Sequence, residues 1–481
     1  MKQAVSAVLA GVVFTIQAAA AAPAGMTWYG IAAENGDVLG YAFEKSVQTP
    51  QGRAAISGQE ITRSEKGSAP SVISSRGVTT EDAAGRALSI VEYSGTADDW
   101  TRTVARIGQD SATVTRETPH DRTVKTVRLP AGVRFDFGKG LLLSWDPAHA
   151  PKLAFDNFDP DAAVIQHIVI EAQAGAPPGL DGGIAALRKI YEGDQLMAVV
   201  RLTLDRDRHL LSSSQPMFGS AITVRVTDRK TALTPHPPYR VLANAMKKSP
   251  FRISDAAAHG HIRYRFSFRD GIDVPMPQTG EQAAVAGPGF TVVDICADCG
   301  PGLPSDTETL TNALKPTVWL QSDDPRIKAI AEPVAKQRIS DADKMEMLRK
   351  ITSYTISRVD FVGYYSAVEA LERRAGDCTE TAVLLAALGR AAGIPTLVAD
   401  GLVYSQERYH GASNVFMPHS WTIAWVDGKW RSFDAALDSF DSTHIAVIVG
   451  DGGQRAALAA NQLAGLLQWD GMGEVKKRPG I

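Results

Sequence analysis

The stretch RAGDCTETAVLLAALGRAAGIP, residues 374–395, decides the fold of the C-terminal part of the chain. Asp377 is a favoured N-cap residue, and Glu380 stands three positions later, where a capping-box carboxylate reaches back to the cap. From Cys378 onward the pattern is helical and apolar on almost every side, which predicts a helix buried in the middle of its domain. Gly393 ends the helix. The sequence therefore predicts a buried helix that begins at a cysteine.

The position of Cys378 has a chemical consequence. A helix N-terminus carries partial positive charge and unpaired N–H groups, and both favour the thiolate over the thiol. The same N–H groups can stabilise an oxyanion. Cys378 is therefore predicted to be a nucleophile if a base lies near it. The alternative is a structural cysteine, because free cysteines are often buried.

A hairpin is predicted downstream, in MPHSWTIAWVDGKWRSFDAAL, residues 417–437. Strand-forming residues lead to the turn signal Asp427-Gly428, and a two-residue loop pairs Val426 with Lys429. In this register, His419 and Asp434 lie on the same face as diagonal neighbours, within reach of a hydrogen bond. A shift of one residue would put them on opposite faces.

These residues predict a catalytic constellation. Cys378 is the candidate nucleophile, His419 the base, and Asp434 the residue that orients the imidazole. Taken singly, His419 could be a structural histidine and Asp434 a turn or cap residue. Their occurrence together in this order favours the catalytic interpretation.

The three motifs resemble those of the bacterial transglutaminase-like superfamily. The matching residues are Gly376, Asp377, Cys378, Glu380, Gly393-Ile394-Pro395, His419, Trp421, and Asp434 with Ala436. The resemblance spans about residues 318–449 and implies a papain-like α+β core with a Cys-His-Asp triad. Members of the superfamily cross-link amides to amines, hydrolyse peptide or isopeptide bonds, deglycosylate, or have lost activity. The resemblance therefore leaves the reaction open.

Length and composition describe an ordinary globular chain. Of 481 residues, 44% are hydrophobic and 21% charged, and the formal net charge is -3, so nothing points to a nucleic-acid partner. The N-terminus reads as a secretory signal over residues 1–22, with Lys2, an apolar run from Ala4 to Ile16, and a cleavage site near Ala20 to Ala22. This predicts a periplasmic or secreted protein with no membrane span. The alternative is an uncleaved anchor.

The remaining chain is predicted to be α+β. Residues 23–237 are rich in strand patterns and turns, which predicts an antiparallel sandwich or a large curved sheet. A bridging β segment with a CxxC motif follows over 238–304, and the transglutaminase-like domain over 305–481. The stretch AGAPPGLDGG, residues 174–183, either divides two β subdomains or forms a long loop. Three acidic residues, Asp156, Asp159 and Asp161, suggest either a calcium-binding site or a solvent-exposed acidic loop.

The motif Cys296-Ala297-Asp298-Cys299 allows three interpretations. In an exported protein the two cysteines form a local disulfide, which leaves Cys378 as the single free thiol. A thioredoxin-like redox motif would open a helix, and Gly300-Pro301 argues against one. A metal site would need two further ligands, and none is spaced nearby in the sequence. No cofactor or metal is predicted.

Several neighbours of the predicted triad have open roles. Tyr364 or Tyr365 could donate a hydrogen bond to an oxyanion, or simply pack in the core. Trp421 could form a wall of the acyl-binding cleft, or likewise pack in the core. His444 is assigned a supporting or structural role rather than a catalytic one. A polar loop over 405–416 either gates substrate or is a plain connection.

The sequence thus predicts an exported thiol enzyme that attacks carboxamide bonds of a protein or peptide through a cysteinyl thioester. Water or an amine resolves the thioester, and the β-rich half provides a possible surface for a cell-envelope partner. The alternative is a non-catalytic binding module with the same fold.

Overall fold

The computed structural model describes residues 25–64, 70–96, 100–119, 122–175, 177, 179–217, 220–239, 246–359, 364–407 and 412–476. The predicted signal peptide lies outside these residues. Contacts divide the described residues into one compact unit up to residue 239 and a second from residue 246 on. Among the described residues, no helix has the length and apolar character needed to cross a bilayer.

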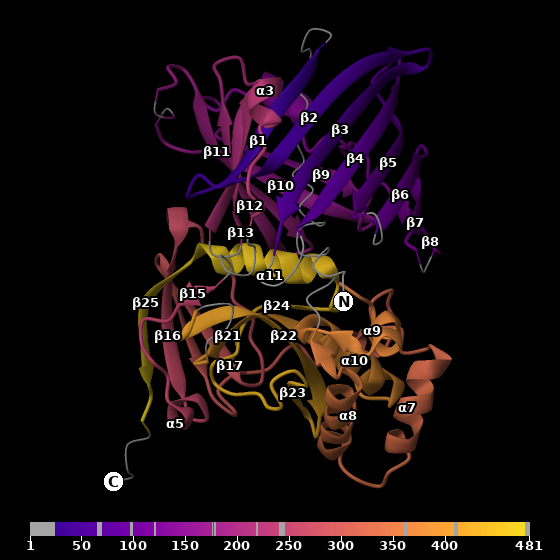
Figure 1. Ribbon diagram of the computed structural model, residues 1–481, viewed down its shortest axis with the longest axis vertical. Helices are drawn as coiled ribbons and strands as arrows, with labels where there is room; N and C mark the ends of the chain where they lie inside the picture. The colour runs from indigo at the N-terminus through magenta and orange to yellow at the C-terminus, as the bar shows by residue number, and fades with distance from the viewer. Residues whose placement is uncertain are drawn as a thin grey trace. The chain divides into compact units, whose positions relative to one another are not determined.

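The N-terminal unit is built on one antiparallel sheet of 14 strands. The strands follow each other as hairpins on either side of its centre, where the first and last strands of the unit pair. This confirms the predicted antiparallel β-rich region, which forms a large curved sheet (Figure 1). The strands are Met26–Ala33 (β1), Val38–Thr49 (β2), Gly52–Arg63 (β3), Ser71–Asp82 (β4), Ala87–Gly95 (β5), Trp100–Ile107 (β6), Ser111–Glu117 (β7), Arg122–Arg128 (β8), Lys152–Asp159 (β9), Val164–Ala172 (β10), Ile184–Glu192 (β11), Gln195–Leu204 (β12), Leu210–Met217 (β13) and Ser220–Thr227 (β14), with short helices at Lys139–Ser144 (α2) and Arg229–Ala232 (α3).

The two ends of this sheet share a hydrophobic core. Ile90 and Val114, from β5 and β7, belong to the same buried cluster as Phe158 in β9. Because β9 is at the opposite end of the strand order from β7, the sheet curls to bring its ends together. The stretch over 174–183 joins β10 to its neighbour β11, so it is a hairpin loop rather than a boundary between subdomains.

The C-terminal unit combines two larger sheets, a short parallel pair of strands at Arg358–Val359 and Ala375–Gly376, and a group of helices. A five-stranded sheet has the order β15-β22-β21-β24 with β23 paired to β22, and a four-stranded sheet has the order β17-β18-β16-β25. The strands are Lys247–Lys248 (β15), Ile262–Phe268 (β16), Gln282–Gly287 (β17), Phe290–Ile295 (β18), Arg358–Val359 (β19), Ala375–Gly376 (β20), Thr396–Ser405 (β21), Val415–Val426 (β22), Lys429–Phe433 (β23), Ile445–Gly450 (β24) and Leu467–Glu474 (β25). The helices are Asp255–Ala258 (α5), Arg269–Gly271 (η1), Thr307–Asn312 (α6), Pro325–Ala335 (α7), Asp341–Thr355 (α8), Ala367–Arg373 (α9), Cys378–Ala391 (α10) and Gln454–Leu466 (α11).

Helix α10 is the buried centre of this unit, as predicted. Its residues from Glu380 to Arg390 are all buried, and helices α7, α8 and α9 pack around it (Figure 1). Its other side packs on β22, where the Thr422 hydroxyl donates a hydrogen bond of 2.9 Å to the carbonyl of Ala382. A helix that is apolar almost all round needs such cover on every side.

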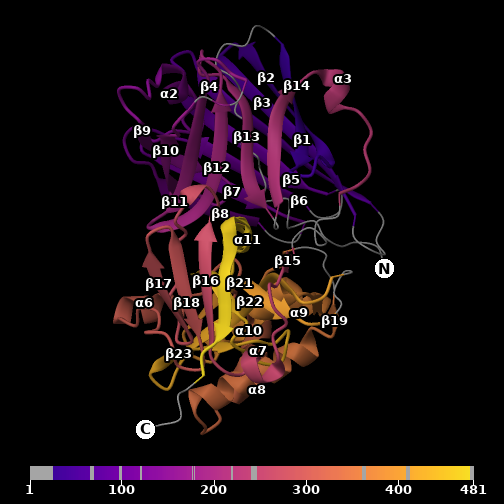
Figure 2. The same cartoon turned by 90° about the vertical axis from the view of Figure 1, so that its left-hand side faces the viewer.

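The end of the chain completes the four-stranded sheet. Helix α11 ends at Leu466, and the residues that follow form β25. Strand β25 pairs with β16 along its length, next to β18 and β17 (Figure 2). Segments about 200 residues apart in sequence therefore form one sheet.

A glycine sets how closely β21 and β24 approach beside the candidate site. Gly401 pairs with His419 of β22, and a Cβ atom at Gly401 would lie 2.0 Å from the carbonyl oxygen of Ile445. The backbone of β24 cannot yield as a side chain could. Gly401 is therefore required at this position.

We expect Gly401→Ala to lower the free energy of unfolding by about 1–3 kcal/mol, because it overpacks two strands. Urea unfolding followed by circular dichroism measures the change. The matched control is Gly473→Ala, since a Cβ atom at Gly473 meets nothing within 4 Å. Equal losses of stability in the two variants would show that the close approach of the Ile445 carbonyl is not the reason why Gly401 is required.

Candidate active site

The start of α10 is fixed by the predicted capping box. The Asp377 side chain accepts a hydrogen bond of 2.8 Å from the backbone N–H of Thr379, and Glu380 Oε2 accepts one of 2.9 Å from Asp377 N–H. The other oxygen of Glu380 accepts from Tyr365 N–H at 3.0 Å. A Cβ atom at Gly376 would lie 2.5 Å from the Cβ of Glu380, so the glycine makes room for this buried carboxylate.

Cys378 lies at an open stretch of the β22 edge. Strand β22 pairs with β15 through Val415 and Phe416, and with β23 from Thr422 onward. Between these contacts, residues 417–421 have no strand partner on that side among the described residues. Pro418, which has no N–H, suits such a stretch. The backbone of Ser420, within this stretch, acts to lower the pKa of the Cys378 thiol.

The hairpin after this edge has the predicted register. Val426 pairs with Lys429 across the turn, and Thr422 pairs with Phe433. Asp434 follows directly, and His419 Nε2 lies 2.8 Å from Asp434 Oδ2. The predicted hydrogen bond between these two side chains is therefore present. Both residues are buried, with 4% and 1% of their surface exposed.

A second imidazole binds the same carboxylate oxygen. His444 Nε2 lies 3.1 Å from Asp434 Oδ2, and His444 Nδ1 lies 3.0 Å from Asp441 Oδ1. Burial opposes the charge on His444, but its hydrogen bonds to the two carboxylates outweigh burial and raise its pKa to about 9. His444 is therefore a cation at neutral pH. The sequence assigned it a supporting role, but gave no signal that it reaches Asp434.

These contacts determine which ring nitrogen of His419 is available. Burial alone would raise the pKa of Asp434, yet attraction to His419 and hydrogen bonds from both imidazoles hold it well below its usual range. An ionised carboxylate only accepts hydrogen bonds, so Nε2 of His419 carries the proton. Its Nδ1 has no hydrogen-bond partner in the described structure. When the ring carries a single proton, Nδ1 is therefore the nitrogen that can accept another.

The electrostatics of Cys378 reverse one sequence expectation. The helix N-terminus was expected to favour the thiolate. Instead, burial raises the pKa of the thiol well above its usual value, and Asp377, Glu380 and Asp434 add to the increase against the opposing hydrogen bond from Ser420. No hydrogen bond joins Cys378 to His419 within the described residues. These effects favour the neutral thiol over the thiolate at Cys378.

Other side chains around the thiol have assigned partners. The Tyr364 hydroxyl donates to the carbonyl of Gly452 at 3.2 Å, and Trp421 is 2% exposed and stacks near His419 with ring centroids 6.1 Å apart.

Asp400 was missed by the sequence analysis. It accepts a hydrogen bond of 2.5 Å from the Ser420 hydroxyl, and burial raises its pKa to about 7. A buried Asp in a strand has no local sequence signature.

The predicted local disulfide is present between Cys296 and Cys299, and Cys378 is the remaining free cysteine. Three groups of described residues bring possible metal-ligating atoms within 4.8 Å of one another. They are His419 with Asp434 and His444, Asp205 with Asp207 and His209, and His261 with Cys296 and Cys299. In the first group the atoms already bond to each other, which explains their proximity without a metal.

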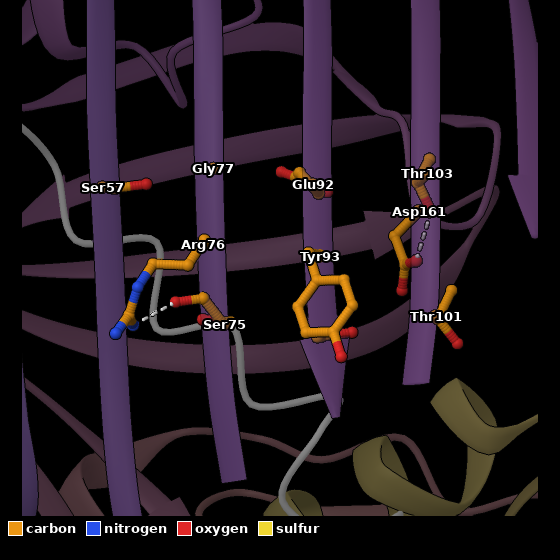
Figure 3. A pocket seen from close by; sticks show the side chains of 10 residues that line it. Ser57, Ser75, Arg76, Gly77, Glu92, Tyr93, Thr101, Thr103 and Asp161 are labelled. Atoms are coloured by element: carbon orange, nitrogen blue, oxygen red, sulfur yellow. Dashed lines mark hydrogen bonds between the residues drawn. The ribbon is translucent and has the colours of Figure 1, made fainter. Parts of the chain in front are cut away.

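A small polar pocket lies in the N-terminal unit, apart from these residues. Its lining side chains come from β3 to β6, together with Asp161 from the turn after β9 (Figure 3). Thr103 donates to Asp161 at 3.1 Å. Burial raises the pKa of Glu92 to about 8, with repulsion from Asp161 and Asp159 contributing. The acidic residues considered for calcium thus have other partners here: Asp159 accepts from Gln166, and Asp156 lies 3.1 Å from His167.

Residues 329–435 match the sequence profile of the transglutaminase-like superfamily. The match contains Cys378, His419 and Asp434. A comparison with curated proteins gives no match.

Three solved structures are similar to parts of the chain. A candidate cysteine protease from Cytophaga hutchinsonii is 16% identical, with a TM-score of 0.28 over 44% of this chain and 87% of its own. A β-barrel-like protein from Brucella abortus, with a domain of unknown function, is 11% identical, with a TM-score of 0.32 over 42% of this chain and 95% of its own. A candidate protease from Parabacteroides distasonis is 15% identical, with a TM-score of 0.19 over 59% of this chain and 68% of its own.

The charge on His444 predicts a pH dependence of stability. Its pKa is about 9 in the folded protein against an ordinary 6.5. Protonated His444 therefore contributes at most about 3 kcal/mol to the free energy of unfolding. This contribution is complete below pH 6.5 and is lost as the pH rises through 9. We expect urea unfolding between pH 6.5 and 9 to show a falling stability that His444→Gln largely removes. His149→Gln is the control, since that side chain is 87% exposed. A parallel decline in both variants would contradict the assignment.

The carboxylates around the thiol predict how Cys378 responds to a change of charge. Asp377→Asn keeps an oxygen for the cap but removes a negative charge that raises the thiol pKa. The pKa of Cys378 should therefore fall, and iodoacetamide should alkylate it faster at neutral pH, with the rate profile shifted to lower pH. Mass spectrometry follows the adduct. Asp343→Asn, an exposed carboxylate at the start of α8, is the control, and an unchanged profile in Asp377→Asn would refute this electrostatic account.

Proposed function

Because residues 329–435 form a transglutaminase-like domain, we propose that the chain is an exported thiol enzyme that cleaves carboxamide bonds through a cysteinyl thioester. The observation that carries the proposal is the 2.8 Å contact of His419 Nε2 with Asp434 Oδ2, which leaves Nδ1 as a base, in the domain whose central helix begins at Cys378. The disulfide supports export, because such bonds persist in oxidising compartments.

In the proposed first step, His419 Nδ1 takes the proton of the Cys378 thiol as the sulfur attacks the substrate carbonyl. The tetrahedral oxyanion would accept from the backbone N–H of Cys378, which at this helix start has no hydrogen-bond partner among the described residues. His419 then gives the proton to the nitrogen as the C–N bond breaks. The products are a thioester on Cys378 and a free amine or ammonia.

In the second step, water or an amine attacks the thioester and loses its proton to His419, and the sulfur leaves as thiol. Water gives a carboxylic acid, and an amine gives a new amide. Asp434 holds the ring and stabilises the imidazolium that forms twice in the cycle. The neutral resting thiol fits this scheme, since charge separates only when substrate is bound.

The second candidate function is a non-catalytic binding module. It is favoured by the raised pKa of Cys378 and by the lack of a hydrogen bond between Cys378 and His419 in the described structure. Catalytic hydrogen bonds are often long or misaligned without substrate. The same observation thus fits an enzyme at rest.

Glutamine-containing peptides, incubated with the full chain after signal removal, test the proposal with and without a fluorescent primary amine. Mass spectrometry follows the Cys378 acyl adduct, peptide cleavage, ammonia release and amine incorporation. We expect no turnover with Cys378→Ala, and a loss of about 10²–10⁴-fold with His419→Gln, since a positioned base contributes that much. His259→Gln, an exposed histidine of the same unit, should retain full activity.

Turnover that persists in Cys378→Ala would refute a thioester mechanism. An inert wild-type protein that binds peptides without an acyl adduct would favour the binding module. Amine incorporation, compared with acid formation, decides which nucleophile resolves the thioester.

A further inference from the structure

Strand pairing brings a histidine to the CxxC motif. Strands β16 and β18 are antiparallel with Ile262 opposite Ile295, so His261 lies across from Cys296. One ring nitrogen of His261 and the sulfur atoms of Cys296 and Cys299 lie within 4.8 Å of one another. The sequence offered no ligand near the motif, because His261 precedes it by about 35 residues.

The ring of His261 is held by a carboxylate. His261 Nε2 lies 2.7 Å from Asp294 Oδ1, and Arg263 donates two hydrogen bonds of 2.9 Å to the same carboxylate. In metal sites, the ring nitrogen of a histidine that does not bind the metal usually donates to a carboxylate, which orients the imidazole. Arg263 balances the charge of Asp294, so this carboxylate adds no net negative charge to the cluster.

We propose that Cys296, Cys299 and His261 form a redox-gated site for a thiolate-binding divalent metal ion of the Zn²⁺ class. In the oxidised state the disulfide uses both sulfurs. A dithiol reductant transfers two electrons and two protons to the S–S bond and is itself oxidised to a disulfide. The two thiols then lose two protons as they bind the metal. Two thiolates and a neutral imidazole are typical zinc ligands, and the remaining position is left for water.

Reduction breaks the S–S bond, whose length is about 2.05 Å. Zn–S bonds of about 2.3 Å at a tetrahedral angle put two sulfurs roughly 3.8 Å apart. The two sulfurs must therefore move apart by roughly 1.7 Å to share a metal ion. All three residues are partly exposed, so reductant and metal have access.

The site borders the strand that leads to Asp434. Lys429 Nζ, at the start of β23, lies 3.1 Å from both oxygens of Asp298, which stands between the two cysteines. Arg431 donates to the carbonyl of Ala297. The loop that carries the two cysteines is thus attached to β23. The proposal does not depend on the thiol-enzyme function.

Cobalt binding to the full chain tests the site, in a Cys378→Ser background that leaves only the two candidate thiols. The protein is reduced with a phosphine under anaerobic conditions, and Co²⁺ is added after the phosphine is removed. We expect one Co²⁺ per chain, with a thiolate-to-cobalt charge-transfer band, and Zn²⁺ should displace it. The same protein with its disulfide intact should give no such band.

His261→Ala should weaken Co²⁺ binding at least about tenfold. Losing only a group that hydrogen-bonds to a metal ligand already lowers metal affinity about 10–100-fold. His259→Ala, an exposed histidine two residues away, should leave it unchanged. Near-ultraviolet circular dichroism checks that the variants fold, and the oxidised protein is a control that needs no substitution. The proposal fails if the reduced protein gives no charge-transfer band, even if its thiols exchange with small disulfides. It also fails if the band and affinity are unchanged in His261→Ala.

Discussion

The carboxylate of Asp434 is the charge on which the C-terminal site depends. A buried carboxylate is costly unless it is paired and hydrogen-bonded. Here one oxygen contacts His419 and His444, and the other accepts backbone N–H bonds from Ala436 at 2.7 Å and Leu437 at 3.1 Å. This single group fixes the end of β23, the ring of His419 and the charge of His444. Removing any partner would leave a buried ion short of a hydrogen bond.

The site is asymmetric in its electrostatics. Cys378 is surrounded by carboxylates that raise its pKa, whereas Asp434 faces two imidazoles that lower its own. Negative charge is therefore stabilised at Asp434, whereas the neutral thiol is favoured at Cys378. A neutral thiol resists oxidation, because the thiolate is the form that reacts.

Local signals in the sequence were sufficient for much of the candidate site. The capping residues Asp377 and Glu380 placed the start of α10, and the Asp427-Gly428 turn fixed the hairpin register that brings His419 to Asp434. The CxxC spacing was enough to predict the disulfide. Each of these rests on residues within a few positions of one another, or on a turn whose length dictates the pairing. The catalytic roles of the three residues remain a prediction.

The helix that begins at Cys378, the hairpin and the β-rich N-terminal half could be predicted from the sequence, because capping, turn geometry and strand alternation are local properties. Three contacts become visible only in the folded chain: His444 shares Asp434, His261 lies beside the disulfide, and β25 returns to pair with β16. The direction of the Cys378 pKa shift likewise depends on the fold. Burial and charge at a side chain are set by groups distant in sequence, and only packing brings those groups together.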